Sequence, residues 1–166
     1  MLPAMSDPRN LSTIERYFSA FASRDGKAMS DCYAPDARFR DPVFELRGAE
    51  IGAMWQMLCS RATDLRIESS NLRAGESDGS ADWQAWYTFS TTGRAVHNVV
   101  SSRFRLAQGR IVEQTDHFPF WRWSRQALGM PGLLLGWTPL IRNKVRQTAR
   151  ASLAHYLKSG QSKNQG

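Results

Sequence analysis

The sequence has few cysteines, and it lacks the long apolar runs and leader patterns of membrane or secreted proteins. Cys32 and Cys59 are the only cysteines among 166 residues, too few for a disulfide framework or a four-cysteine zinc site. No run of about 18 or more apolar residues is present, which excludes a spanning helix. Because the first ten residues show no basic segment followed by an apolar one, we expect a cytoplasmic protein.

The patterns of cofactor and metal sites are also missing. The sequence has no glycine-rich phosphate loop, and the spacing of its three histidines does not suit a metal site. The segment GESDG at 75–79 matches the G-x-S-x-G pattern, but it lies in a polar turn between two expected strands. A nucleophile elbow needs a strand before it and a helix after it. We therefore expect neither a cofactor nor a metal ion.

What the sequence does have is an uneven distribution of charge. Eight of its 22 Lys and Arg residues lie in 122–166, which contains no Asp or Glu, so residues 1–121 hold 14 bases against all 15 acids. The basic character belongs to the tail, and we expect no nucleic-acid partner. The sequence predicts a pocket domain over 1–121 and a basic amphipathic helical extension over 122–166, packed on that domain or projecting from it.

The period of the apolar residues changes along the chain. Helical spacing predicts helices over 12–24, 27–33, 49–61 and 139–158, the first begun by a capping box at Ser12–Glu15. Alternation predicts strands over 37–41, 65–73, 81–91, 95–106 and 110–121. Short turns between the later strands indicate an antiparallel meander, and helices followed by strands indicate an α+β fold.

Strand parity divides the side chains of the expected sheet into two faces. Asn98, Ser102 and Asp116 lie on the aromatic face, where a carboxylate is costly to bury unless it is paired, hydrogen bonded or protonated. Asp116 is therefore a candidate functional group, or it only caps a hydrogen bond at a wet edge. The aromatic residues predicted to form the wall of a pocket are Trp55, Trp83, Tyr87, Phe89, Phe118 and Phe120.

Two further candidates also have simple structural explanations. Asp41 precedes Pro42, and an Asp-Pro pair favours a turn. Tyr17 lies on the apolar stripe of the first helix, where a tyrosine is usually a core residue with a satisfied hydroxyl.

The order of three short segments resembles the nuclear transport factor 2-like superfamily, in particular its ketosteroid isomerase-like and SnoaL-like polyketide cyclase branches. These segments are IERYFSAFASRDG, YAPDARFRDPVF and FRLAQGRIVEQTDHF. The resemblance covers roughly residues 9–120. It implies a cone-shaped, curved antiparallel sheet wrapped by N-terminal helices around a deep apolar pocket, and a homodimer.

The resemblance also implies roles for individual residues. Tyr17 and Asp41 reproduce the spacing of the ketosteroid isomerase pair, whereas the second acid of that enzyme falls at Ser102. Asp116 falls where SnoaL-like cyclases carry an acid on a late strand. By this resemblance Asp41 removes a proton next to a carbonyl of a hydrophobic small molecule, and Tyr17 and a protonated Asp116 donate to the enolate oxygen. Asn98 and Ser102 orient the substrate.

Two other functions stay open at the level of the sequence. The same pocket could hold a lipophilic ligand without turnover, since this fold hosts enzymes and carriers alike. The basic extension, preceded by LLLGW at 133–137, could make peripheral contact with the inner membrane surface through residues 122–158. Alternatively, it lids the pocket or forms a dimer contact.

Overall fold

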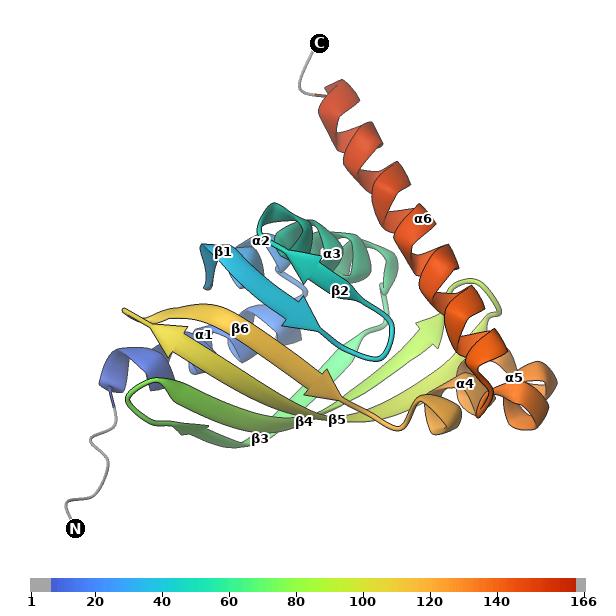
Figure 1. Ribbon diagram of the computed structural model, residues 1–166, viewed down its shortest axis with the longest axis horizontal. Coiled ribbons are helices and arrows are strands. Elements are labelled where there is room, and N and C mark those ends of the chain that lie inside the picture. Colours follow the sequence, from blue (N-terminus) through green and yellow to red (C-terminus); the bar gives the residue numbers. More distant parts are fainter. Residues whose placement is uncertain (1–6, 164–166) are drawn as a thin grey trace.

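The computed structural model describes residues 7–163 and shows one curved sheet with α1, α2 and α3 on one side of it (Figure 1). The strands lie in the order β2-β1-β6-β5-β4-β3. The predicted antiparallel meander is confirmed for β3 to β6, but β1 pairs with β6 in parallel. The elements are α1 (Pro8–Ala22), α2 (Gly26–Ser30), β1 (Tyr33–Arg40), β2 (Glu45–Arg47), α3 (Ala49–Arg61), β3 (Arg66–Ala74), β4 (Asp78–Phe89), β5 (Arg94–Ala107), β6 (Arg110–His117), α4 (Phe120–Leu128), α5 (Met130–Leu135) and α6 (Pro139–Lys163).

The ends of several elements differ from the prediction: β1 spans Tyr33–Arg40 rather than 37–41, α2 ends at Ser30 rather than at residue 33, and α6 continues to Lys163 rather than ending at 158. Two further differences have a local cause. Helix α1 begins at Pro8 rather than at Ser12, because Asp7 caps it by accepting the Arg9 N–H at 2.9 Å and proline suits the first helical position. The last strand ends at His117 rather than at residue 121, and α4 begins soon after Pro119, which has no N–H for the sheet. The three-residue strand β2 was not predicted from the sequence at all.

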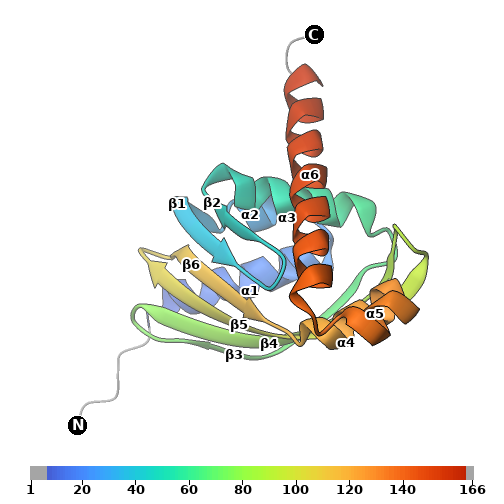
Figure 2. The ribbon, with the colours of Figure 1, turned by 45° about the vertical axis from the view of Figure 1, so that its right-hand side comes forward.

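The C-terminal segment covers one end of the sheet and then passes along its edge (Figure 2). Ile141 and Val145 of α6 pack with a small apolar cluster around Trp123 of α4. Further along α6, Leu153 is buried in the main core. The extension therefore packs on the body of the protein through its apolar side.

Some predictions concern features that lie outside the structure. Residues 1–6 and 164–166, at the outer ends of the two predicted domain ranges, lie outside the described residues. The division at residue 121, the homodimer and the cytoplasmic location stay predictions. Among residues 7–163, none of the helices has the length and apolar character needed to cross a membrane.

Candidate functional site

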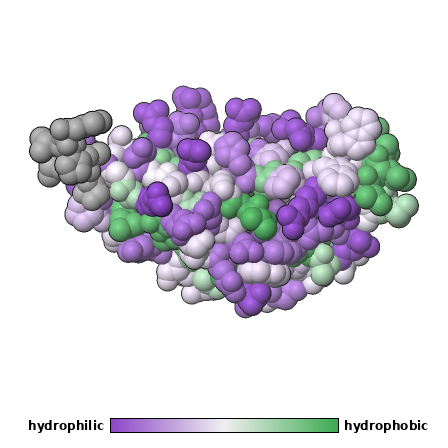
Figure 3. Space-filling view, turned by 90° about the horizontal axis from the view of Figure 1, so that it is seen from below, coloured by the Kyte–Doolittle hydropathy of each residue, from purple (hydrophilic) through white to green (hydrophobic). Residues whose placement is uncertain are grey.

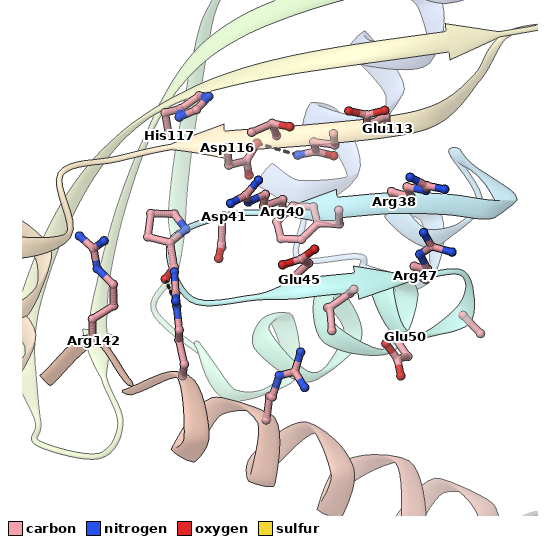
Figure 4. Close-up of a pocket in the computed structure, with 18 residues that line it drawn as sticks. Arg38, Arg40, Asp41, Glu45, Arg47, Glu50, Glu113, Asp116, His117 and Arg142 are labelled. Atoms are coloured by element: carbon pink, nitrogen blue, oxygen red, sulfur yellow. Dashed lines mark hydrogen bonds between the residues drawn. The ribbon is translucent and has the colours of Figure 1, made fainter. Parts of the chain in front are cut away.

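A groove of about 1210 Å³ lies between strands β1, β2 and β6 and helix α6 (Figure 4). Asp41, directly after β1, and Asp116 on β6 both line it. Most of the remaining lining is charged, with Glu45, Glu50 and Glu113 as its other acids. The arginines that line the groove are Arg38, Arg40, Arg47, Arg142, Arg146 and Arg150.

Asp116 is held at one carboxyl oxygen and open at the other. Its Oδ1 accepts hydrogen bonds from the Ser102 hydroxyl at 2.5 Å and from Nε2 of Gln114 at 3.0 Å. Its Oδ2 makes no hydrogen bond, yet it is not among the fully buried side-chain polar atoms without a partner, of which the described part of the chain has only Asn10 Oδ1. Oδ2 of Asp116 therefore keeps some exposed surface, in contact with the groove. A proton on Asp116 would lie on Oδ2, because Oδ1 already accepts two hydrogen bonds.

Sheet register explains how Asp116 is held. Ser102 lies directly opposite it on β5, and Gln114 precedes it by two residues on the same face of β6. Trp83 Nε1 donates to the Ser102 hydroxyl at 2.8 Å, which orients that hydroxyl toward Asp116. Ser102 is 1% exposed, so it positions Asp116 from within the core and does not line the groove.

Gln114 is the centre of a second set of buried hydrogen bonds. Its Nε2 also donates to the Tyr17 hydroxyl at 3.2 Å, and its Oε1 accepts from the Tyr33 hydroxyl. Trp55 Nε1 in turn donates to the Tyr33 hydroxyl at 2.9 Å. Gln114 and Tyr17 are both 0% exposed. Tyr17 therefore reaches Asp116 through Gln114, and its hydroxyl does not line the groove.

Asp41 closes a turn and also lines the groove. Its Oδ1 accepts the backbone N–H groups of Val43 and Phe44, each at 2.6 Å, which closes the turn from β1 into β2. The side chain is only half-buried and lines the groove, and its second oxygen makes no hydrogen bond within residues 7–163. As at Asp116, one carboxyl oxygen is fixed by the protein and the other is free.

Both carboxyls have raised pKa values. Burial raises the pKa of Asp41 from 3.8 to about 6, against the lowering effect of its two backbone hydrogen bonds and of Arg146. Burial raises the pKa of Asp116 further, to about 7, and the nearby charge of Asp41 adds to this rise. Near neutral pH the site can therefore hold one ionised and one protonated carboxyl.

Helix α6 is tied to the site at Arg146. Its Nε donates to the Pro42 carbonyl oxygen at 2.9 Å, next to Asp41 in the chain. This contact joins residues 104 positions apart in the chain. No local pattern in the sequence signals this contact, so Arg146 was not among the predicted site residues. Gln114 and Tyr33 are likewise absent from the predicted site residues, although Gln114 lies two residues before Asp116 and therefore on the same face of β6.

The predicted aromatic wall is used for packing. Trp55 and Trp83 both make edge contacts with Phe21 of α1, with ring centroids 5.0 and 5.2 Å apart. Both tryptophans are buried in the main core, away from the groove. Asn98, predicted to orient substrate, is half-buried and is also absent from the groove lining.

The other four aromatic residues are covered by the C-terminal extension. Trp123 of α4 donates its Nε1 to the Tyr87 hydroxyl at 2.8 Å and contacts the ring of Phe89 at 5.5 Å. The same cluster contains Phe118 and Phe120. The groove is therefore more polar than the resemblance implies, because α4 and α6 occupy the apolar end of the sheet.

The groove shows no metal-binding arrangement among the described residues. Within residues 7–163, His, Cys, Asp and Glu side chains do not gather in groups of three or more that could hold a metal ion. The charged and titratable side chains that line the groove carry carboxyl, guanidinium and imidazole groups.

Comparison with known proteins supports the fold and identifies the family. No protein of curated function matches the sequence. A nuclear transport factor 2-like protein of unknown function from Burkholderia pseudomallei has a similar structure, with a TM-score of 0.62, 18% identity, and coverage of 73% of this chain and 98% of that one. A protein with a ketosteroid isomerase-like fold from Catenulispora acidiphila, in complex with trimethylamine, is similar with a TM-score of 0.63 and 13% identity. The match covers 76% of this chain and 97% of that one. A candidate polyketide cyclase from Silicibacter sp. TM1040 is similar with a TM-score of 0.58 and 21% identity, over 71% of this chain and 95% of that one.

These structures confirm the nuclear transport factor 2-like fold. The profile of the SnoaL-like domain matches residues 14–114, which extend from α1 into β6 and end before α4. This match covers more than half of the chain, and the chain therefore belongs to the SnoaL-like domain family.

Proposed function

We propose that the groove catalyses proton transfer at a carbon next to a carbonyl group, with Asp41 as the base and Asp116 as the acid that binds the carbonyl oxygen. Membership of the SnoaL-like family supports a ligand-binding or enzyme-like role. The observation that carries the catalytic proposal is the pair of carboxyls in one groove, each fixed at Oδ1 and each with a raised pKa.

The proposed step needs no group from outside the chain. The free oxygen of ionised Asp41 takes a proton from the carbon, and the electron pair of that C–H bond moves to the carbonyl oxygen as an enolate forms. Oδ2 of protonated Asp116 donates a hydrogen bond to this oxygen. Asp41 then returns its proton to the same carbon or to a conjugated one. Tyr17 and Ser102 act by holding Gln114 and Asp116, without contact with substrate.

The charge of the groove refines the substrate class. Six arginines and three glutamates line it besides the two aspartates, so an anionic group on the substrate is favoured over a wholly apolar molecule. We therefore propose a carbonyl compound that also carries a carboxylate or another anionic group. Arg142, Arg146 and Arg150 succeed one another at intervals of four along α6, so they lie on one face of the helix.

The pH dependence follows from the two roles. Asp41 must be ionised, so activity rises through about pH 6, and Asp116 must be protonated, so activity falls above about pH 7. A bell-shaped profile with its maximum between these values is expected.

The proposal is tested by deuterium exchange, which requires no knowledge of the final product. A panel of ketones and keto acids is incubated with the protein in heavy water, and loss of the proton next to the carbonyl is followed by NMR. Asp41→Asn should abolish exchange, whereas Asp36→Asn, an exposed aspartate on the same strand, should leave it unchanged. Equal exchange by the wild type and Asp41→Asn would refute the assignment of the base. Binding of a panel compound without exchange would favour a carrier.

A further inference from the structure

A group of large apolar side chains is exposed at the end of the molecule where α5 lies. Nine large apolar side chains are exposed in the described part of the chain, and six of them fall within residues 130–140. Trp137 is 72% exposed and Leu140 is 69% exposed. Figure 3 shows apolar side chains gathered at this end. The α5 patch consists of Met130, Leu133, Leu134, Leu135, Trp137 and Leu140.

The α5 patch faces solvent because α5 packs through its glycines. A Cβ on Gly132 would lie 1.9 Å from the Ser124 carbonyl oxygen, and one on Gly136 would lie 2.1 Å from the Ser124 hydroxyl. Ser124 itself is 0% exposed. The narrow side of α5 is therefore pressed against α4, and the leucines are on the opposite side. Burying leucine and exposing glycine is the ordinary arrangement of a surface helix, and α5 has the reverse.

Hydrogen bonds also hold the patch in place. Trp121 of α4 donates its Nε1 to the Leu133 carbonyl oxygen at 3.2 Å, and Trp137 donates its Nε1 to the Leu134 carbonyl oxygen at 3.1 Å. Gly129, with φ of +70°, turns the chain between α4 and α5. The exposed side chains are thus presented by an ordered structure.

The chain segment that carries the patch has charge of one sign. No acidic residue occurs anywhere in 122–166. Arg122, Arg125 and Lys144 are exposed and do not belong to the groove. The Arg125 guanidinium lies 4.9 Å from the ring of Trp121, which keeps a cation at the base of α5.

We propose that the α5 patch inserts into the surface of an anionic membrane. Leucine and tryptophan side chains on one side of a short helix suit the boundary between headgroups and acyl chains, and nearby Lys and Arg attract anionic lipids. A second copy of the chain is disfavoured as the occupant, because two segments that each carry eight bases and no acids repel each other. The proposal does not depend on the chemistry of the groove.

Sedimentation of the full-length protein with vesicles tests the proposal. One set of vesicles contains phosphatidylcholine alone, and the other contains phosphatidylcholine mixed with phosphatidylglycerol. The wild type should sediment with the anionic vesicles, less so as salt is added, and weakly or not at all with the neutral ones. The double variant Leu134→Ser/Trp137→Ser should bind at least about tenfold more weakly, because it removes two inserted apolar groups.

Two further variants separate the apolar and electrostatic contributions. Leu58→Ser/Val99→Ser removes two exposed apolar side chains elsewhere on the molecule and should bind like the wild type. Arg122→Gln/Lys144→Gln should bind more weakly by about fivefold for each charge removed. Thermal unfolding of each variant checks that it is folded.

Three results would overturn the proposal. One is failure of the wild type to bind anionic vesicles at low salt. Another is unchanged binding by the Leu134→Ser/Trp137→Ser variant. The third is self-association that requires the α5 patch while vesicle binding is absent, measured by analytical ultracentrifugation, which would assign the patch to a second copy.

Discussion

Replacing Asp116 with asparagine tests the electrostatics of the site without a known substrate. Burial raises the pKa of Asp116 from 3.8 to about 7. Folding therefore favours the protonated acid, and the stability that this provides is fully present below about pH 4 and is lost as the pH rises through about 7. At about 1.4 kcal/mol per pH unit, the difference between the two pKa values corresponds to about 4 kcal/mol of unfolding free energy.

Asp116→Asn should remove this pH dependence and keep the packing. An asparagine has no charge in this range, and its Oδ1 can still accept from Ser102 and from Gln114. Wild type and variant should be about equally stable near pH 4, and the variant should be more stable by up to about 4 kcal/mol near pH 8. Urea unfolding followed by tryptophan fluorescence across this pH range measures the difference.

The control and the refuting result are both clear. Asp36→Asn replaces an exposed aspartate and should leave the profile of the wild type unchanged. A stability difference between wild type and Asp116→Asn that is the same at every pH would refute the reasoning, because it would mean that folding does not shift the pKa of Asp116. In Asp41→Asn, carboxyl NMR titration should show a lower pKa for Asp116, since the charge of Asp41 raises that pKa.

Three other perturbations follow from single contacts. Arg146→Gln should raise the pKa of Asp41, because the nearby guanidinium lowers it, and carboxyl NMR titration measures this shift; no shift would contradict the contact. Gln114→Leu should lower the unfolding free energy by about 2–3 kcal/mol, since the buried Tyr17 hydroxyl loses its hydrogen-bond donor, the Tyr33 hydroxyl loses its acceptor and Asp116 loses one of its two donors; urea unfolding would contradict this by showing a loss well below about 1 kcal/mol. Gly132→Ala should destabilise the protein by about 1–3 kcal/mol because its Cβ meets the α4 backbone, whereas Gly160→Ala, with nothing within 4 Å of its Cβ, should not. Equal melting temperatures for the two alanine variants would refute the packing of α5 on α4.

Local pattern was sufficient for much of the fold and for part of the site. Side chains alternate along a strand, so period-two alternation put Ser102 and Asp116 on one face of the sheet, and the structure shows them hydrogen bonded across β5 and β6. The Asp-Pro pair indicated a turn after β1, and Asp41 closes that turn. The same local reasoning failed at α1, where an earlier aspartate and proline provide a better start than the capping box at Ser12.

The use of the aromatic residues could not be read from parity. Alternation shows which side chains share a face, but it does not show what covers that face. Trp83 was correctly placed on the inner face, yet α1 fills the space beside it, and Trp123 of α4 covers Tyr87 and Phe89. The residues predicted to form a pocket wall are therefore packed core residues. The groove lies elsewhere, between β1, β2, β6 and α6.

The sequence by itself determined the family, the α+β architecture, the inward face of the late strands and the separation of a neutral body from a basic tail. These properties depend on residue type, spacing and side-chain alternation, which are local. The family resemblance implied a common site for Asp41 and Asp116, but tertiary structure alone decided that they line a charged groove between β1, β2, β6 and α6, because this depends on parallel pairing of β1 with β6 across about 75 residues. It also decided that Arg146 reaches Pro42 and that α5 turns its leucines outward, because both follow from how distant segments pack against one another.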